Sequence, residues 1–407
     1  MKLYFRSNQV TMKMKSIFIF LFAFIFAATG FGQSKPEFRA VWISTVSNID
    51  WPKNGEWDSD KQKESFIRLL NKYKADGFNA VIVQIRPAGD AFYPSAYEPW
   101  SQWLTGTQGK APVPYYDPLK FMIDETHKRG MEFHAWLNPF RAVFNIKTAT
   151  LAPNHVAKQH PGWFVNYGGK KYFNPGIAEA RKFVVDVVHD IVKRYKVDAI
   201  HMDDYFYPYR IPGKDFPDYR TFQNADTKLS LAEWRRSNVD STIVALYRTI
   251  KKVNPKCQFG ISPFGVWRNN DVDSTGSATR AGISNYDDLY ADILLWLKNG
   301  WIDYVAPQLY WEIEHPKAPF LTLLDWWSNH TYGKNCYIGI GIYKAGSNEA
   351  WKDTMQLGRQ IDAIRNTPNV QGMAFYSSTI LERNPNGWTD SLRLNYFKQP
   401  AKTPQIN

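Results

Sequence analysis

Residues 184–205, VVDVVHDIVKRYKVDAIHMDDY, contain the pattern that decides the fold. Val184, Val188 and Ile191 recur at helical spacing, and the stretch 197–205 that follows has the short apolar character of a strand. The two elements are joined almost directly, as they are where a helix packs back against a parallel sheet. The stretch therefore predicts one helix followed by one strand of an α/β protein.

The same unit recurs along the chain. Stretches with strand character occupy 38–45, 80–87, 132–139, 197–205, 257–265, 302–310, 336–344 and 370–378. The segments that lead from strand to helix are long, as in 88–116 and 142–176, whereas the returns from helix to strand are short. Eight such units predict an α/β fold, the closed (β/α)8 TIM barrel, with long βα loops at its C-terminal face. Active sites of such barrels lie at that face.

Alternate residues of each strand are expected to point into the barrel. In the fourth stretch, Ile200 and Met202 would face the helices, which leaves His201 and Asp203 inside. The same alternation brings further side chains inside: Trp42, Ser44, Gln84, Arg86, His134, Trp136, Asn138, Ser262, Gln308, Tyr310, Tyr376 and Ser378. Because these side chains become polar toward the C-terminal strand ends, where a structural core would stay apolar, the pattern indicates a binding site.

Asp203 and Asp204 are adjacent acids at the end of the predicted fourth strand. Neighbouring carboxylates repel each other unless each has its own partner, so the pair is a candidate for catalysis. We expect the inward Asp203 to attack or stabilise a developing oxocarbenium centre. Asp204 either caps the following loop or takes a direct part by bracing a loop, a metal or a sugar hydroxyl.

Glycoside hydrolysis also needs a carboxyl group that protonates the leaving oxygen. Glu312 is the first candidate, because it follows the sixth predicted strand with the parity of that strand's inward residues. A solvated loop glutamate is the alternative interpretation of this residue. Asp50, Asp90 and Glu98 are rival acids in the first and second long loops.

Aromatic residues make up 16% of the chain, and many fall at or beyond the predicted strand ends. Sugars stack their CH faces on rings while their hydroxyls need planar polar partners, so rings beside arginine and asparagine favour a saccharide groove, although some rings will simply pack the loops. The predicted substrate-binding residues are Trp42, Arg86, Asp90, Glu98, Trp100, Trp136, Asn138, Arg141, His201, Tyr205, Trp267, Arg268, Gln308, Tyr310 and Trp311.

Other classes of site find little support in the sequence. It has no His-Glu-x-x-His or paired-cysteine zinc pattern and no Gly-x-Ser-x-Gly elbow, so we expect no metal, no cofactor and no serine-hydrolase chemistry. The 50 Lys+Arg against 38 Asp+Glu give a formal net charge of +12, which would favour an anionic polymer such as a cell-wall glycan but also fits nucleic acid or mere solubility. The basic residues are dispersed and form no recognition motif, so nucleic acid is not an expected partner.

The N-terminal stretch differs in composition from the rest of the chain. Lys13 and Lys15 precede an apolar run at 17–28, and small residues follow it. This pattern predicts a signal peptide over residues 1–33 and a single barrel domain over 34–407. The apolar run is shorter than the about 20 residues that span a bilayer. We therefore expect an exported protein, periplasmic or secreted, with no transmembrane segment in its mature form.

Several ordered motifs resemble the glycosyl-hydrolase-like 10 family of exported bacterial proteins, over residues 37 to about 385. They are Glu37 to Ile43 with Asp50 to Pro52, Gln84 to Ser95, Glu98 to Ser101, Leu104 to Gly106, Ala135 to Arg141, His201 to Pro208, Ser262 to Asn269 and Pro307 to Trp311. Asp203 and Asp204 match the acidic motif of the family's fourth strand. Glu312 lies just beyond the matching Tyr310-Trp311 pair.

The resemblance implies a glycosidase-type (β/α)8 barrel of the bacterial envelope that acts on peptidoglycan glycan strands stripped of their peptides. The sequence thus predicts an exported glycoside hydrolase with a polysaccharide substrate. Two alternatives remain open: a carbohydrate-binding barrel without turnover, and a hydrolase or lyase that acts on another extracellular polysaccharide.

Overall fold

The computed structural model describes Met1 and residues 35–405. Apart from Met1, the predicted signal peptide over 1–33 lies outside the described residues. The chain from Lys35 onward forms one compact unit. Within residues 35–405, no helix is both long and apolar enough to cross a membrane.

The predicted (β/α)8 barrel is confirmed. Within the described residues, eight parallel strands close in the order β1-β2-β3-β7-β8-β9-β10-β11 and back to β1. Each strand overlaps one of the predicted stretches: β1 (Phe38–Ile43), β2 (Ala80–Arg86), β3 (Glu132–Leu137), β7 (Ala199–Met202), β8 (Gln258–Ile261), β9 (Tyr304–Val305), β10 (Asn335–Ile340) and β11 (Gly372–Phe375). Each strand is shorter than its predicted stretch.

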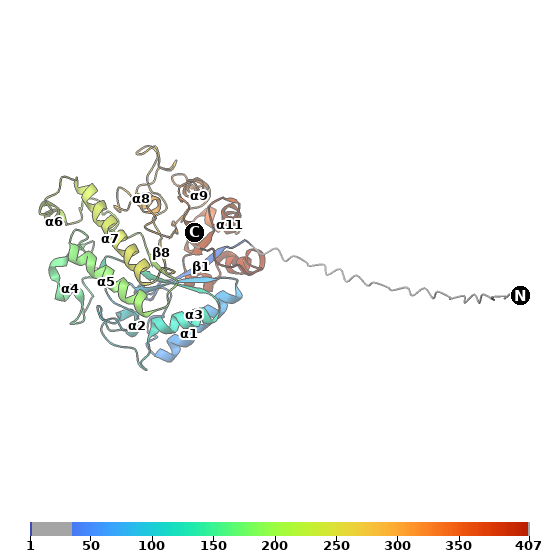
Figure 1. Ribbon diagram of the computed structural model, residues 1–407, viewed down its shortest axis with the longest axis horizontal. Coiled ribbons are helices and arrows are strands. Elements are labelled where there is room, and N and C mark those ends of the chain that lie inside the picture. Colours follow the sequence, from blue (N-terminus) through green and yellow to red (C-terminus); the bar gives the residue numbers. More distant parts are fainter. Residues whose placement is uncertain (2–34, 406–407) are drawn as a thin grey trace. The chain divides into compact units, whose positions relative to one another are not determined.

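A principal helix follows each strand, and these helices surround the strands in Figure 1. They are α1 (Ser59–Ala75), α3 (Pro118–Lys128), α5 (Ala178–Arg194), α7 (Leu231–Val253), α8 (Ile293–Lys298), α9 (Phe320–Ser328), α11 (Gln356–Asn366) and α12 (Ser378–Arg383). Helix α5 buries Val184, Val188 and Ile191, the apolar face that the sequence predicts. Helix α7 begins at a capping box, in which Ser230 accepts from the Glu233 backbone and the Glu233 side chain accepts from Ser230.

The long loops carry additional small elements. A three-stranded antiparallel sheet in the order β4-β6-β5 lies between β3 and α5 and consists of β4 (Arg141–Val143), β5 (Phe164–Tyr167) and β6 (Lys170–Phe173). Short helices occupy α2 (Gln102–Thr105), α4 (Val156–Gln159), α6 (Tyr219–Gln223), α10 (Glu349–Lys352) and α13 (Trp388–Ser391). Single tight helical turns occur at Val46–Asn48, Pro161–Trp163, Ile342–Lys344 and Pro385–Gly387, and a π-helical turn at Leu392–Tyr396.

Strand alternation sorts the core into two layers, as predicted. Ile200 and Met202 belong to the outer layer between strands and helices. The inner layer consists of Phe38, Ala40, Trp42, Ala80, Ile82, Trp136, Ala199, Tyr304, Ala306, Tyr337 and Ala374. Its most crowded point is at Gly260, where an added Cβ atom would lie 1.9 Å from the Tyr304 ring. The Tyr304 side chain therefore fills the barrel interior only because residue 260 has no side chain.

Candidate active site

A cavity of about 500 Å³ opens at the C-terminal ends of the barrel strands. Nine of the predicted catalytic and substrate-binding residues line it: Trp42, Trp136, Arg141, Asp203, Asp204, Tyr205, Gln308, Tyr310 and Trp311. Among the lining residues, all of which the structure describes, Asp203 and Asp204 are the two carboxylic acids. Both side chains are almost fully buried in the free protein. The cavity therefore combines one acidic pair with aromatic and amide walls.

Asp203 follows the last residue of β7, and hydrogen-bond donors from β3 and its following loop hold its carboxylate. Asn138 Nδ2 donates to both oxygens at 3.1 Å, and Trp136 Nε1 donates to Oδ2 at 3.2 Å. Burial raises the pKa of Asp203, while the positive charge of Arg141 and these donors act to lower it. Donors and a nearby cation favour the ionised form of a carboxyl group. On balance the pKa of Asp203 is raised by burial, and the donors and Arg141 oppose that larger effect.

The Asn138 side chain is itself fixed in orientation. The backbone N–H of Arg141 donates to Asn138 Oδ1 at 2.8 Å, which leaves the amide nitrogen facing Asp203. Arg86 NH1 donates to the backbone oxygen of Asn138 at 2.6 Å, and its Nε donates to Glu98 Oε2 at 2.8 Å. The Arg86–Glu98 ion pair is fully buried. This pair therefore positions Asn138 from behind and does not line the cavity that Asp203 faces.

Asp204 has a different environment from Asp203. Burial, together with the charge of Asp203, raises the pKa of Asp204 to about 7. Tyr209 Oη donates a short hydrogen bond to Oδ2 of Asp204, and Gln308 Nε2 donates to Oδ1 at 3.3 Å. Gln308 is held in turn, because its Nε2 also donates to the Ser262 backbone oxygen at 2.9 Å. A buried carboxyl group with this pKa carries its proton through mildly acidic pH.

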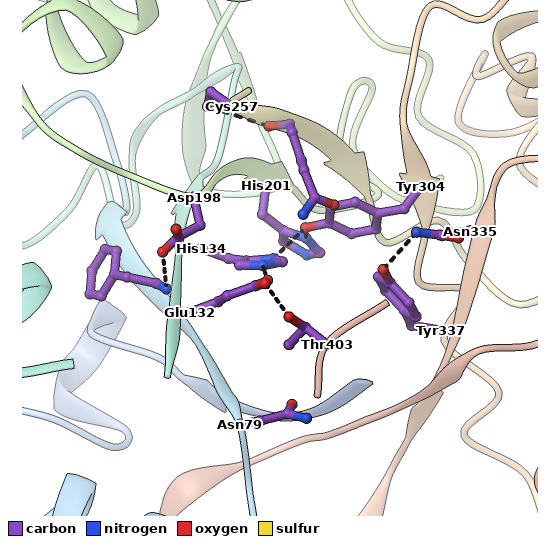
Figure 2. A network of polar contacts seen from close by, with 12 residues as sticks. Asn79, Glu132, His134, Asp198, His201, Cys257, Tyr304, Asn335, Tyr337 and Thr403 are labelled. Carbon is purple, nitrogen blue, oxygen red and sulfur yellow. Dashed lines mark hydrogen bonds and ion pairs between the residues drawn. The ribbon is translucent and has the colours of Figure 1, made fainter. Parts of the chain in front are cut away.

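The floor of the cavity rests on a buried polar network that runs through the barrel. Figure 2 shows His134 and His201 converging on the hydroxyl of Tyr304, which lies 2.8 Å from Nδ1 of each ring. His201 Nε2 lies 2.9 Å from Ser262 Oγ, and Ser262 lines the cavity. Burial and the neighbouring His134 lower the pKa of His201 well below its ordinary value, which favours a neutral ring. His201 therefore supports the cavity floor from below, with its own side chain fully buried.

The structure places Glu312, the predicted general acid, outside the lining of this cavity. Its Oε2 accepts from Trp351 Nε1 at 3.0 Å, and its Oε1 accepts from Asn348 Nδ2 at 3.4 Å. The side chain therefore ties the loop after β9 to α10. The parity that suggested an inward direction fails because β9 ends at Val305, well before residue 312.

Several predicted sugar contacts also lie elsewhere. Asp90 faces a second cavity of about 260 Å³, where Gln108 Nε2 donates to its Oδ2 at 3.1 Å. Trp100 packs edge to face on Tyr115. Trp267 stacks on Trp326, and Arg268 pairs with Asp273 and Asp287. None of these residues lines the main cavity. Asn138, which donates to Asp203, and the buried Arg86–Glu98 pair, which holds Asn138, also do not line the main cavity.

Sequence reasoning missed other residues of the cavity wall. Tyr209, Phe144, Phe264, Tyr343 and Lys344 all line the cavity, together with Val46 and Ile49. Of the alternating tyrosines after β7, Tyr207 turns away and donates to Asp218 Oδ2 at 3.2 Å, whereas Tyr209 contacts Asp204. The Tyr-Pro-Tyr run at 207–209 was the available signal, but spacing alone does not show which ring turns inward.

The closed parallel barrel has a cavity at the C-terminal strand ends, and this cavity contains two aspartates with different surroundings among aromatic rings. These features are typical of a (β/α)8 barrel of glycoside hydrolase type. The model of the family described as glycosyl hydrolase-like 10 matches residues 37–356. The chain belongs to this family.

Similar proteins come from several bacteria. "Glycosyl hydrolase YngK" of Bacillus subtilis (strain 168) is 48% identical over 381 residues, which cover 92% of this chain and 74% of that protein. "Glycosyl hydrolase DigH" of Escherichia coli (strain K12) is 36% identical over 377 residues, which cover 86% of this chain and 85% of that protein.

Solved structures of low sequence identity share the fold. The PgaB (BpsB) glycoside hydrolase domain from Bordetella bronchiseptica superimposes with a TM-score of 0.56 at 15% identity, over 88% of this chain and 98% of that one. The catalytic domain of a β-amylase from Paenibacillus polymyxa has a TM-score of 0.60 at 13% identity, over 90% of this chain and 99% of that one. Both likenesses concern the barrel.

Proposed function

We propose that this protein is a glycoside hydrolase in which Asp204 is the general acid and Asp203 the carboxylate that faces the developing positive charge. The observation that carries the proposal is the pairing of two adjacent aspartates with different surroundings in one cavity. Asp203 has donors and Arg141 beside it, whereas burial and Asp203 itself keep Asp204 protonated. When two carboxyl groups in one site have different pKa values, the protonated one can act as the acid and the ionised one as the base or charge stabiliser.

In the proposed reaction, Asp204 transfers its proton to the glycosidic oxygen as the bond from that oxygen to the anomeric carbon breaks. The ionised Asp203 stabilises the positive charge that develops on the sugar. A water molecule then adds its oxygen to the anomeric carbon and returns a proton to Asp204. Each group is thereby restored, and no oxidant, reductant or cofactor is consumed.

We further propose that the substrate is a cell-envelope glycan, namely peptidoglycan strands without peptides, and that the protein is exported to reach it. Support for this substrate is the family resemblance of the sequence motifs, the aromatic wall of the cavity and the surplus of positive charge. Support for export is the basic and apolar pattern of the first 33 residues.

The test is incubation of the purified mature protein with denuded glycan strands, followed by mass analysis of the products. Hydrolysis adds one water to each cleaved bond and creates a new reducing end. A lyase would leave an unsaturated or anhydro sugar of lower mass, and a binding barrel would retain the strands without cleaving them. Either of these two results would contradict the proposal.

A further inference from the structure

A second compartment lies beside the candidate active site. It has a volume of about 340 Å³ and shares Arg141, Phe144, Tyr205 and Tyr209 with the main cavity. Its outer wall comes from the small β4-β6-β5 sheet and from the loop that follows Pro208. The two spaces are therefore neighbours that share four lining side chains.

Two cations line this compartment, and its lining, which lies wholly within the described residues, contains no carboxylate. Arg141 is 8% exposed, and its Nε donates to the Pro87 backbone oxygen at 3.0 Å. Lys170 lies on β6, and its Nζ is 5.2 Å from the centroid of the Phe144 ring. The guanidinium carbon of Arg141 is 5.4 Å from the same centroid. Both cations therefore gather at one ring.

Within residues 35–405, no acid lies at ion-pair distance from the buried Arg141 or from the partly exposed Lys170, although the charge of Arg141 also acts on Asp203. Arg86, Arg235 and Lys251 of the same chain each have an acidic partner. An arginine held by its Nε keeps its two terminal nitrogens for a ligand, and their fork geometry matches a carboxylate. The compartment therefore has the charge and donors for one anionic group.

The remaining walls suit a sugar. Tyr172 and Tyr167 face the compartment from the small sheet, while Tyr205 and Tyr209 face it from the loop after β7. Tyr209 also donates to Asp204, so a sugar that contacts this ring lies next to the proposed general acid. A unit in the compartment would thus be close to the bond that is cleaved.

We propose that this compartment binds the carboxylate of an acidic sugar adjacent to the cleaved bond, through Arg141 and Lys170. The proposal rests on the proposed glycosidase function and adds the residues that select the substrate. The required chemistry is a pyranose that carries a carboxylate, either as a lactyl ether on an amino sugar or as a uronic acid. Lys170 binds and positions the substrate and takes no part in the chemical step.

The experiment compares denuded peptidoglycan strands with the same strands after their carboxyl groups have been reduced to alcohols. We expect the wild-type protein to show a KM at least tenfold higher on the reduced strands. Lys170→Gln should raise the KM on native strands about tenfold, which is the effect of losing one charge-assisted contact, with kcat within about twofold of wild type. On reduced strands, Lys170→Gln should match the wild type.

Lys171→Gln is the matched control. Lys171 is the next residue of the same strand, does not line the compartment and carries the same charge. It should leave both KM values unchanged, whereas Lys170→Arg should restore most of the affinity for native strands. Equal KM values for native and reduced strands in the wild type would overturn the proposal, as would a Lys170→Gln effect that persists on reduced strands.

Binding measured by calorimetry separates this proposal from the proposed hydrolysis. If native strands bind at least tenfold tighter than reduced strands but are never cleaved, the proposed carboxylate binding is supported and the hydrolase assignment is wrong. If native and reduced strands are both cleaved with equal KM, the hydrolase assignment is supported and the proposed carboxylate binding is wrong. A soluble polyuronide added as competitor distinguishes the two sources of the carboxylate: competition that Lys170→Gln abolishes indicates a uronic acid, and its absence indicates the lactyl ether.

Discussion

Asn138 donates from one amide nitrogen to both carboxylate oxygens of Asp203, at 3.1 Å each. The loop after β3 thereby holds the acid that follows β7, and the register of the two strands, with Trp136 opposite His201, sets their separation. The backbone N–H of Arg141 fixes the direction of the amide from the other side. This contact keeps Asp203 in place and favours its ionised form.

Replacement of Asn138 by leucine should therefore affect both rate and pH dependence. Asn138→Leu removes donors that lower the pKa of Asp203, so this pKa rises and the acidic limb of the kcat/KM profile moves to higher pH. The rate at the optimum should fall about a hundredfold, as expected for loss of a positioned donor. A pH profile of glycan cleavage measures both effects. An unchanged acidic limb would show that Asn138 has only a packing role.

The alkaline limb of the same profile should report Asp204. Its pKa is raised to about 7, chiefly by burial, and the group must hold its proton to act as an acid, so activity should fall as pH rises through about 7. Tyr209 donates to the ionised form and lowers this pKa. Tyr209→Phe should therefore move the alkaline limb to higher pH. A shift in the opposite direction would assign the limb to another group.

Glu312 provides a direct contrast between two candidate acids. Its carboxylate is bound to Trp351 Nε1 outside the main cavity. Glu312→Gln keeps an oxygen that accepts from Trp351, so we expect full glycan-cleaving activity and a loss of unfolding free energy of about 1 kcal/mol or less. Steady-state kinetics and thermal unfolding measure the two quantities. A rate loss of a hundredfold or more would return the acid role to Glu312.

The buried Arg86–Glu98 pair should matter mainly for stability. Both side chains are fully buried, and removal of one partner leaves the other charge without compensation. Glu98→Gln should lower the free energy of unfolding by about 3–5 kcal/mol. The double variant Arg86→Met with Glu98→Leu should recover part of this loss, because it leaves no buried charge. Chemical denaturation measures both, and a double variant less stable than Glu98→Gln would contradict this explanation.

The barrel and its inward residues were predictable because they follow from local periodicity. Asp203 lies one residue beyond Met202, close enough to the strand for alternation to remain valid. Strand alternation also remained valid at Gln308, because the backbone of this residue still pairs with Phe264 and Gly339 after β9 ends. Within this range, sequence parity identified residues that line the cavity of the candidate site.

The remainder depended on contacts between segments far apart in the sequence. Alternation placed Arg86 inside the barrel, but only the fold shows that Glu98, from the following loop, neutralises it there. Asp204 became an acid candidate through burial, which raises its pKa together with the charge of Asp203, and spacing does not reveal that burial. Glu312 was misplaced because strand alternation no longer applies so far beyond Val305, and its side chain instead accepts from Trp351.

The central claim, that the adjacent aspartates perform the cleavage, is tested most directly by the rate at which variants release new reducing ends from denuded glycan strands. Asp203→Asn and Asp204→Asn should each lose at least about a thousandfold in kcat, the scale at which one essential catalytic group contributes. Asp186→Asn, at a half-buried acid on α5 paired with Lys182, should keep the wild-type rate. Wild-type kinetics from Asp203→Asn would contradict the account.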